Sequence, residues 1–359
     1  MLSTLGISFL AQNGGIGWST TFDLGPRGVL INLAHLDSVT FNADKSQATI
    51  GAGAIISKTI AAAHQAGALV LTGNCNCVGT LGAILGGGYG NLMGKYGFGV
   101  DNVISLRLVT PDGHLRTVTA KSDPDLFWAL RGAGPNFGIV TSAVIKSYPA
   151  NGPEDLQAWT GALVFTPDKL EQVVQAIQDL NREPDMNIFM YFLSLGPPSN
   201  TPAIFTTPFL YKGNATTGRQ KFASLFALNP IADTTAVLPY NQWNSAGEAF
   251  CVKGFRKPTY GAGIQRLVPS VWRQVWDEFV AFQSRPGAEN SGVLLETYSL
   301  EKARSFPPES ASFPFRGVNF QAIAIQWYTD PALDGAAQET GRKIRDLWRG
   351  EDGLGRNST

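Results

Sequence analysis

The chain has 359 residues, with 28 Lys and Arg against 28 Asp and Glu, so its formal net charge is zero. A balanced charge argues against a nucleic-acid-binding protein, which needs a basic face, and no block of like charges indicates a membrane surface. No apolar run approaches the roughly 20 residues of a membrane-spanning helix, and no basic segment opens a signal peptide. We expect a globular protein of two or three domains, cytoplasmic by default.

The first part of the chain is typical of short strands with helices between them. Apolar spacing predicts a helix over residues 55–65, which Gly67 ends. Asp112-Gly113 is a strong turn pair and predicts a hairpin. Ser122 or Asp123 is suited to cap a short helix that runs to Leu130. The expected strands are residues 29–32, 48–50, 103–110, 114–119 and 139–148.

Residues 149–153 (P-A-N-G-P) mark the most plausible domain boundary, which divides the chain into domains 1–149 and 150–359. Beyond it, Thr166 and Pro167 are typical of the N-cap and first position of a helix. Two rounds of helices and long strands favour an α+β domain, in which helices cover one face of an antiparallel sheet and leave the other free to cover a cofactor. The expected strands are 158–165, 187–195, 203–211, 291–300 and 318–327, and the expected helices are 167–180, 217–226, 269–284 and 332–349.

Glycine is enriched and clustered, with 40 residues in the chain, against a usual share of roughly 7%. Two stretches are dense in it: residues 73–90 (G-N-C-N-C-V-G-T-L-G-A-I-L-G-G-G-Y-G) and residues 125–140. Backbone without Cβ atoms can close on a bulky, anionic cofactor. Any one such loop is more often an ordinary turn, but the clustering predicts a cofactor cradle, and Cys75 is a potential nucleophile within it.

The three cysteines are Cys75, Cys77 and Cys251. An odd set of three does not indicate a disulfide framework. The Cys75-x-Cys77 pair lacks a second pair or a His cluster, so we expect no zinc or other metal site. A buried core residue is the alternative interpretation for each thiol, and it is the favoured one for Cys77.

Four stretches, taken together, resemble the fungal FAD-linked oxidoreductases of the berberine-bridge-enzyme-like family, which has a PCMH-type FAD domain of the vanillyl-alcohol-oxidase-like fold. Residues 11–18 (A-Q-N-G-G-I-G-W) are similar to the pyrophosphate loop. Residues 73–90, followed by Asp101-Asn102-Val103, are similar to the cysteinyl-flavin loop, and residues 125–140 to a third FAD-contacting segment. A weaker match, Phe313-Pro-Phe-Arg316, resembles the substrate domain.

The resemblance implies FAD as the cofactor and a role for each matching residue. Cys75 matches the cysteine that bonds to the flavin ring, a reaction helped by a thiol pKa that N–H dipoles lower. Ile16 stands where the family carries a second linking residue, a His, so Cys75 alone can form the tether. Val78 stands where family members that react with O₂ often carry Val and those that do not carry Leu, so the resemblance implies reaction with O₂. The implied cofactor-binding residues are Asn13, Gly14, Gly15, Gly17, Trp18, Gly73, Asn74, Cys75, Val78, Gly79, Gly82, Gly86, Gly87, Gly88, Tyr89, Gly90, Gly134, Asn136, Gly138 and Val140.

Compared with this family, the chain is short at both ends. Relatives begin with a βα unit before the pyrophosphate loop and end with a segment that returns to the FAD domain. We therefore expect the N-terminal part of the FAD domain and the C-terminal return segment to be missing. Exposed apolar surface is expected where those parts pack.

The resemblance implies an oxidase of a small organic molecule, such as an alcohol, a sugar or a secondary-metabolite intermediate. In such enzymes a hydride passes to flavin N5 and O₂ reoxidises the cofactor. The alternative is a truncated, redox-inactive relative that binds a ligand or catalyses an isomerisation. Glu296 is a candidate base if its strand faces the flavin, although a solvated strand glutamate is the commoner case. Tyr191, Tyr298 and Tyr328 are candidates for hydroxyl contacts, with packing as the commoner role.

Overall fold

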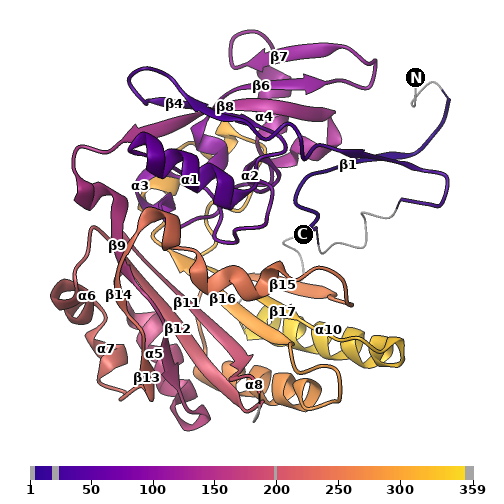
Figure 1. Ribbon diagram of the computed structural model, residues 1–359. Helices are drawn as coiled ribbons and strands as arrows, with labels where there is room; N and C mark the ends of the chain where they lie inside the picture. The colour runs from indigo at the N-terminus through magenta and orange to yellow at the C-terminus, as the bar shows by residue number, and fades with distance from the viewer. Residues whose placement is uncertain (1–4, 18–23, 198–199, 352–359) are drawn as a thin grey trace.

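The computed structural model describes residues 5–17, 24–197 and 200–351. Its upper half in Figure 1 holds a six-stranded sheet of order β3-β4-β8-β6-β7, with β5 paired to β8. Every pairing in this sheet is antiparallel. The strands are β3 (Val39–Phe41), β4 (Gln47–Gly51), β5 (Ala68–Val70), β6 (Val103–Val109), β7 (Leu115–Thr119) and β8 (Ile139–Pro149), and the helices are α1 (Ile56–Ala66), α2 (Thr80–Ile84), α3 (Met93–Tyr96) and α4 (Pro124–Ala133).

Local sequence signals position these elements as expected. Gly67 ends α1 in the left-handed conformation, with φ 69°, which glycine adopts without steric cost. Gly113 has φ 84° at the β6–β7 turn, and the Asp112 carboxylate accepts a hydrogen bond from the His114 N–H at 3.2 Å. Of the two capping candidates, Asp123 caps α4 by accepting from the Leu126 N–H.

The first strands described form a separate parallel pair, β1 (Phe9–Gln12) with β2 (Val29–Asn32). Parallel strands are usually covered on both faces. Here Phe9, Val29 and Leu30 keep 41%, 38% and 47% of their surface exposed. Apolar surface is therefore exposed at this pair of strands.

The lower half of Figure 1 holds a second, antiparallel sheet of nine strands. The helices α5 (Leu170–Asp179), α8 (Pro269–Gln283) and α10 (Asp334–Glu351) cover one of its faces. The α+β expectation is confirmed. The strands are β9 (Gln157–Thr160), β10 (Leu163–Phe165), β11 (Met186–Ser194), β12 (Pro202–Tyr211), β13 (Ala232–Asp233), β14 (Ala236–Pro239), β15 (Thr259–Ile264), β16 (Gly292–Tyr298) and β17 (Phe320–Ile325), and the shorter helices are α6 (Ala215–Lys221), α7 (Ala223–Phe226) and α9 (Glu301–Arg304).

Two expected elements are interrupted in the structure. Residues 158–165 form two strands because Gly161 has φ 151°, a value that breaks regular strand geometry. The helix expected at 217–226 begins earlier, since Asn214 accepts a hydrogen bond from the Thr217 N–H at 3.0 Å. It is broken at Phe222, whose ring is fully buried.

Side chains along the central strand β16 alternate between the two faces of the second sheet, and the two sets pack in different cores. Val293 and Leu295 join the core beneath the helices. Leu294, Glu296 and Tyr298 have the opposite parity and point toward the first sheet. Tyr298 accordingly belongs to the core of the first half. The face without helices is therefore turned toward the glycine-rich segments.

A buried ion pair joins the two halves of the molecule. Its residues, Asp101 and Arg316, belong to two different stretches that resemble the family. Arg316 donates to both carboxylate oxygens of Asp101, at 2.6 and 2.9 Å. Their side chains are 6% and 1% exposed. Asp101 also accepts from the Phe98 N–H at 2.9 Å. This bidentate pair fixes the loop before β17 against the first half of the chain.

Asp101→Asn is expected to lower the free energy of unfolding by about 3–5 kcal/mol, because it leaves the Arg316 guanidinium buried without its counter-charge. Urea unfolding followed by circular dichroism measures the change. Asp37→Asn is the matched control, since Asp37 pairs with Lys58 at an exposed site and such pairs contribute little. Equal unfolding midpoints for the two variants would contradict the assignment.

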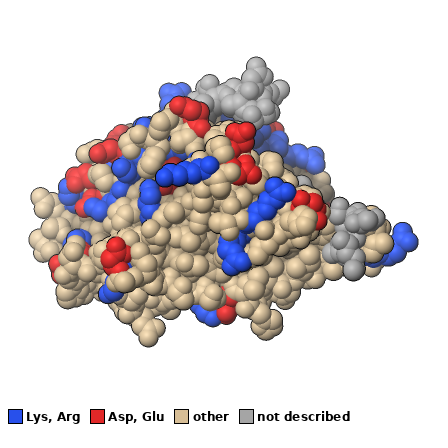
Figure 2. Space-filling view, turned by 90° about the horizontal axis from the view of Figure 1, so that it is seen from above, with Lys and Arg blue, Asp and Glu red and all other residues tan. Residues whose placement is uncertain are grey.

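The surface carries charges of both signs. On the face shown in Figure 2, basic and acidic side chains are interspersed over a mostly uncharged surface. None of the helices among the described residues has the length and apolar character needed to cross a membrane.

Candidate functional site

Two of the three predicted glycine segments pack directly on each other. A Cβ atom on Gly14 would lie 2.3 Å from the Cys77 carbonyl oxygen, and one on Gly79 would lie 2.7 Å from Asn13 Nδ2. Asn13 Nδ2 donates to the Ala54 carbonyl at 3.1 Å. The loop after β1 therefore lies against the loop that carries Cys75, a contact that requires glycine on both sides.

Within the second segment, the glycines divide into open and packed positions. A Cβ on Gly82 would meet no atom within 4 Å, and one on Gly86 would meet only helix carbonyls, the nearest at 3.8 Å. Both positions are exposed and four residues apart, so they lie on one face of the α2 turn. In contrast, Gly87, Gly88 and Gly90 have no room for a Cβ, because it would lie 2.5, 2.6 and 1.9 Å from Phe313, Gly99 and Thr72.

One contact joins the third glycine segment to the second. A Cβ on Gly134 would lie 2.8 Å from the Leu85 side chain at the end of α2. Gly138, with φ 148°, packs instead on the Val109 carbonyl of β6, and Val140 is buried in β8. Asn136 is exposed and donates to the Ala133 carbonyl. These positions serve local packing in the structure, and their cofactor role stays a prediction.

A cavity of about 420 Å³ lies beside the first glycine loop, a size in the range of ligand sites. Gly15, Ile16 and Gly17 form one side of it, and Trp18 lies outside the described residues. The opposite side is basic. The remaining lining residues are Val252, Lys253, Gly254, Phe255, Arg256, Lys257, Pro258, Tyr328, Asp334 and Gln338.

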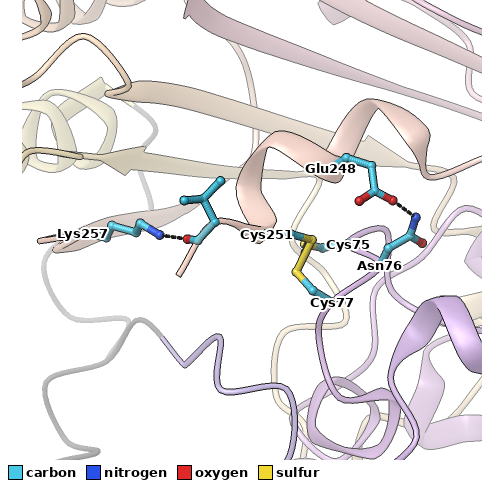
Figure 3. The surroundings of a disulfide bond; sticks show 7 residues. Cys75, Asn76, Cys77, Glu248, Cys251 and Lys257 are labelled. Atoms are coloured by element: carbon cyan, nitrogen blue, oxygen red, sulfur yellow. Dashed lines mark hydrogen bonds between the residues drawn. A yellow bond between two sulfur atoms is a disulfide. The ribbon is translucent and has the colours of Figure 1, made fainter. Parts of the chain in front are cut away.

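Charge and backbone at this cavity suit an anionic group. Lys253 Nζ lies 3.6 Å from the Cβ position of Gly15, whose φ is 69°. Arg256 is paired with Asp334 at 3.0 Å, while Lys257 donates to the Val252 carbonyl (Figure 3). A basic wall opposite side-chain-free backbone is the arrangement that binds phosphates and carboxylates.

Cys75 is a half-buried free thiol whose pKa is raised, not lowered as expected. Burial is the main cause, and the carboxylates of Glu248 and Glu296 raise it further. The Cys77 N–H acts in the opposite direction without reversing the shift. The free thiol is therefore protonated at neutral pH, and its reaction requires a partner that removes the proton.

The other two cysteines are joined, contrary to the sequence interpretation. Cys77 forms a disulfide with Cys251 across 174 residues of sequence (Figure 3). Cys251 ends the 3₁₀ segment Ser245–Cys251, so the bond ties this segment to the Cys75 loop. Cys75 Sγ lies 3.6 Å from Cys77 Sγ and 3.8 Å from Cys251 Sγ.

Glu296 faces this loop from the second sheet. Tyr298 donates its hydroxyl proton to Glu296 Oε2 at 2.7 Å, and Asn74 Nδ2 donates to the Tyr298 hydroxyl oxygen at 2.7 Å. Burial raises the pKa of Glu296, and the Tyr298 hydrogen bond partly opposes this shift. The interpretation of Glu296 as a solvated strand residue is therefore wrong, and its strand lies directly over the residue that precedes Cys75.

Neighbouring strands extend the polar group around Glu296. Gln321 lies opposite Glu296 in the β16–β17 register and donates to the Tyr89 hydroxyl at 2.9 Å. Burial and the Glu296 carboxylate raise the pKa of both Tyr89 and Tyr191. A carboxyl of raised pKa beside hydroxyl groups is suited to acid–base chemistry. Tyr328 lies elsewhere, at the cavity, where it donates to Asp334 at 2.7 Å.

Sequence reasoning missed the contribution of residues 248–257. Glu248 hydrogen-bonds with Asn76 next to Cys75, Cys251 closes the disulfide, and three cations follow within six residues of it. The short basic run was a visible signal for the cavity wall. Nothing in the sequence indicated which loop it would face, because the contact joins residues more than 170 positions apart.

Known proteins with similar sequences are FAD-linked oxidoreductases. A family model described as an FAD binding domain matches residues 2–119. The FAD-linked oxidoreductase OXR1 of Pyricularia oryzae is 31% identical over 354 residues, which cover 94% of this chain and 68% of that protein. The FAD-linked oxidoreductase hasG of Aspergillus fumigatus is 30% identical over 357 residues, which cover 95% of this chain and 74% of that protein.

Solved structures share the fold at lower identity. BBE-like 1 of Physcomitrella patens superposes with a TM-score of 0.81 at 17% identity, covering 97% of this chain and 77% of that one. The xylooligosaccharide oxidase of Myceliophthora thermophila C1 gives a TM-score of 0.78 at 20% identity, covering 96% and 75%. At these identities the likeness establishes the fold.

Proposed function

This chain belongs to the FAD-linked oxidoreductases, and from that premise we propose that it is an O₂-using oxidase of a small organic molecule, such as an alcohol, a sugar or a secondary-metabolite intermediate. Membership follows from 31% identity across 68% of a curated relative. Support for the oxidase activity comes from proteins of the same fold whose names describe oxidases of xylooligosaccharides and chitooligosaccharides.

The residues present fit FAD. The open face at Gly82 and Gly86 allows a planar group to approach the backbone without meeting a Cβ. The loop of Gly14, Gly15 and Gly17 offers N–H groups for a diphosphate, and Lys253 at the adjoining cavity adds positive charge. When bound, FAD supplies the hydride acceptor at N5 and the route for electrons to O₂.

The role of Cys75 in this proposal is a single covalent tether to the cofactor. Ile16 has no nucleophilic atom, so the N-terminal loop offers no second link at that position. Loss of the Cys75 proton is opposed by burial and by two carboxylates, and it is helped by the Cys77 N–H. Glu296, which interacts with Cys75 electrostatically, is a candidate acceptor for that proton.

The role of Glu296 is that of general base toward a substrate hydroxyl. Tyr298 orients its carboxylate through a hydrogen bond of 2.7 Å, and Asn74 fixes Tyr298 in turn. A raised pKa makes the carboxylate a stronger base than an exposed glutamate. The observation that carries the proposal is this chain of hydrogen bonds from the second sheet to the residue beside Cys75.

The deciding experiment mixes the FAD-loaded protein with candidate alcohols and sugars in air. An oxidase bleaches its flavin with substrate, regains colour with O₂ and releases hydrogen peroxide in proportion to substrate consumed. Flavin that is reduced and then stays reduced in air contradicts the oxidase assignment in favour of a dehydrogenase.

A redox-inactive relative that binds a ligand or catalyses an isomerisation is the second candidate. The observation that favours it is Ile16, which removes a nucleophile from the loop beside the cavity. A protein that holds FAD tightly, converts a candidate substrate to an isomer and never bleaches its flavin would support this candidate over the oxidase.

Val78→Leu is expected to slow reoxidation of the reduced flavin by O₂ by about tenfold, the effect of a barrier raised by ~1.4 kcal/mol. Val78 is partly buried three residues after Cys75, and its N–H donates to the Cys75 carbonyl at 3.2 Å. A larger side chain there fills space beside the proposed ring. Stopped-flow spectroscopy measures reoxidation, with flavin reduction by substrate as the internal control. An unchanged reoxidation rate would place Val78 away from the path of O₂.

A further inference from the structure

The fold brings three sulfur atoms from two distant segments to one point. Cys75 and Cys77 come from the loop before α2, and Cys251 comes from the 3₁₀ segment of the second half (Figure 3). All three Sγ atoms lie within 4.8 Å of one another. The proposed covalent link to the flavin uses only Cys75. It does not explain why the sulfurs of Cys77 and Cys251 lie at the same point.

The spacing of these sulfurs matches a thiolate metal site. Zinc–sulfur bonds of about 2.3 Å in a tetrahedron place neighbouring sulfurs about 3.8 Å apart. Cys75 Sγ already lies 3.6 and 3.8 Å from its two neighbours. The third pair of sulfurs, Cys77 and Cys251, is joined by the disulfide bond and is therefore closer than in a metal site. Reduction of this bond frees both sulfurs as ligands.

The charge around the sulfurs also favours a cation. Glu296 approaches the same loop from the second sheet, through its hydrogen bond with Tyr298, which in turn accepts from Asn74. The hydrogen bond between Asn76 and Glu248 holds one carboxylate at the rim of the cluster (Figure 3). A bound divalent cation would offset the negative charge of three thiolates beside these carboxylates, whereas a thiolate without a cation would lack a counter-charge.

We propose that, once the Cys77–Cys251 bond is reduced, Cys75, Cys77 and Cys251 bind one thiophilic divalent cation of the Zn²⁺ or Cd²⁺ class, with the fourth position open to water. A dithiol supplies the two electrons and two protons that convert the disulfide to two thiols, and it leaves as a cyclic disulfide. Cation binding then releases the three thiol protons. Soft thiolate ligands select metals of this class.

This proposal departs from the sequence expectation that no zinc or other metal site is present. The Cys75-x-Cys77 pair lacked a partner in the sequence, and the structure supplies one 174 residues from Cys77. Because Cys75 belongs to both chemistries, a cation on the three thiolates and a covalent flavin on Cys75 exclude each other.

The test uses FAD-free protein that is reduced with a dithiol, freed of the reductant under nitrogen and titrated with Cd²⁺. The sulfur-to-cadmium charge-transfer absorbance is expected to saturate at one Cd²⁺ per chain. Protein with the disulfide intact is expected to show no such band. Cys75→Ser, which leaves the disulfide pair in place, is expected to weaken binding by the reduced protein at least tenfold.

Cys251→Ser separates this proposal from the proposed function. It removes one cation ligand while leaving Cys75 for the flavin, so it is expected to weaken Cd²⁺ binding by the reduced protein at least tenfold and to keep covalent FAD. Absence of a stoichiometric band in reduced wild-type protein, or equal Cd²⁺ affinity in Cys75→Ser, would overturn the cation site. Neither result bears on the flavin tether, which is read separately as acid-stable absorbance.

Discussion

Cys75→Ala is expected to abolish covalent flavin completely while leaving FAD bound non-covalently. Acid precipitation of the wild-type protein is expected to carry yellow colour into the pellet, and the variant is expected to release all of it into the supernatant. The reason is that Ile16 provides no second nucleophile, so no other bond holds the ring. The absorbance of pellet and supernatant measures the two fractions.

The control for this prediction is Cys251→Ser. It also removes a sulfur within 3.8 Å of Cys75 and opens the disulfide, but it keeps the proposed nucleophile. Its flavin is expected to stay acid-stable. Acid-stable flavin in Cys75→Ala would contradict the account, because the link would then run through a residue outside this loop.

Glu296→Gln is expected to lower kcat by about 10²–10⁴-fold, the usual contribution of a positioned general base. Glutamine keeps the size of the side chain and an oxygen that accepts from Tyr298, so FAD content and folding are expected to be unchanged. Anaerobic stopped-flow measurement of flavin reduction by substrate isolates the affected step. Glu248→Gln is the matched control, as its exposed carboxylate also acts on Cys75 but makes no hydrogen bond in the Tyr298 chain.

The pH dependence of activity provides a second test of Glu296 as the general base. The raised pKa of Glu296 moves the acidic limb of activity above the ordinary carboxyl value of about 4.3. Activity is then lost as pH falls through that raised pKa, because the base becomes protonated. The limb is expected to disappear in Glu296→Gln. A variant within about threefold of wild type, with the same acidic limb, would remove Glu296 from the mechanism.

Much of the fold could be predicted from local patterns, for a physical reason. The long central strands β11, β12 and β16 and the helix α8 bury regular apolar faces, and such periodicity is written in the sequence. Short strands such as β13, with two residues, escaped prediction because their stability comes from neighbouring strands rather than from their own pattern.

The candidate site was predictable only in part. The sequence G-V-L-L-E-T-Y of β16 is apolar on both faces apart from its glutamate and threonine, so alternation could not assign Glu296 to the side of the cofactor. The pairing of Cys77 with Cys251 depends on how the two halves pack, which a count of three cysteines does not contain. The raised pKa of Cys75 depends on the same packing, since burial is its main cause and the contributing carboxylates of Glu248 and Glu296 come from the second half of the chain.

The amount of FAD taken up by the purified chain tests the central claim most directly. Titration with FAD, followed by the loss of flavin fluorescence and by the visible spectrum after gel filtration, is expected to give one FAD per folded chain. A chain that keeps its circular dichroism spectrum and its unfolding transition, yet retains no FAD, would contradict the account at its base.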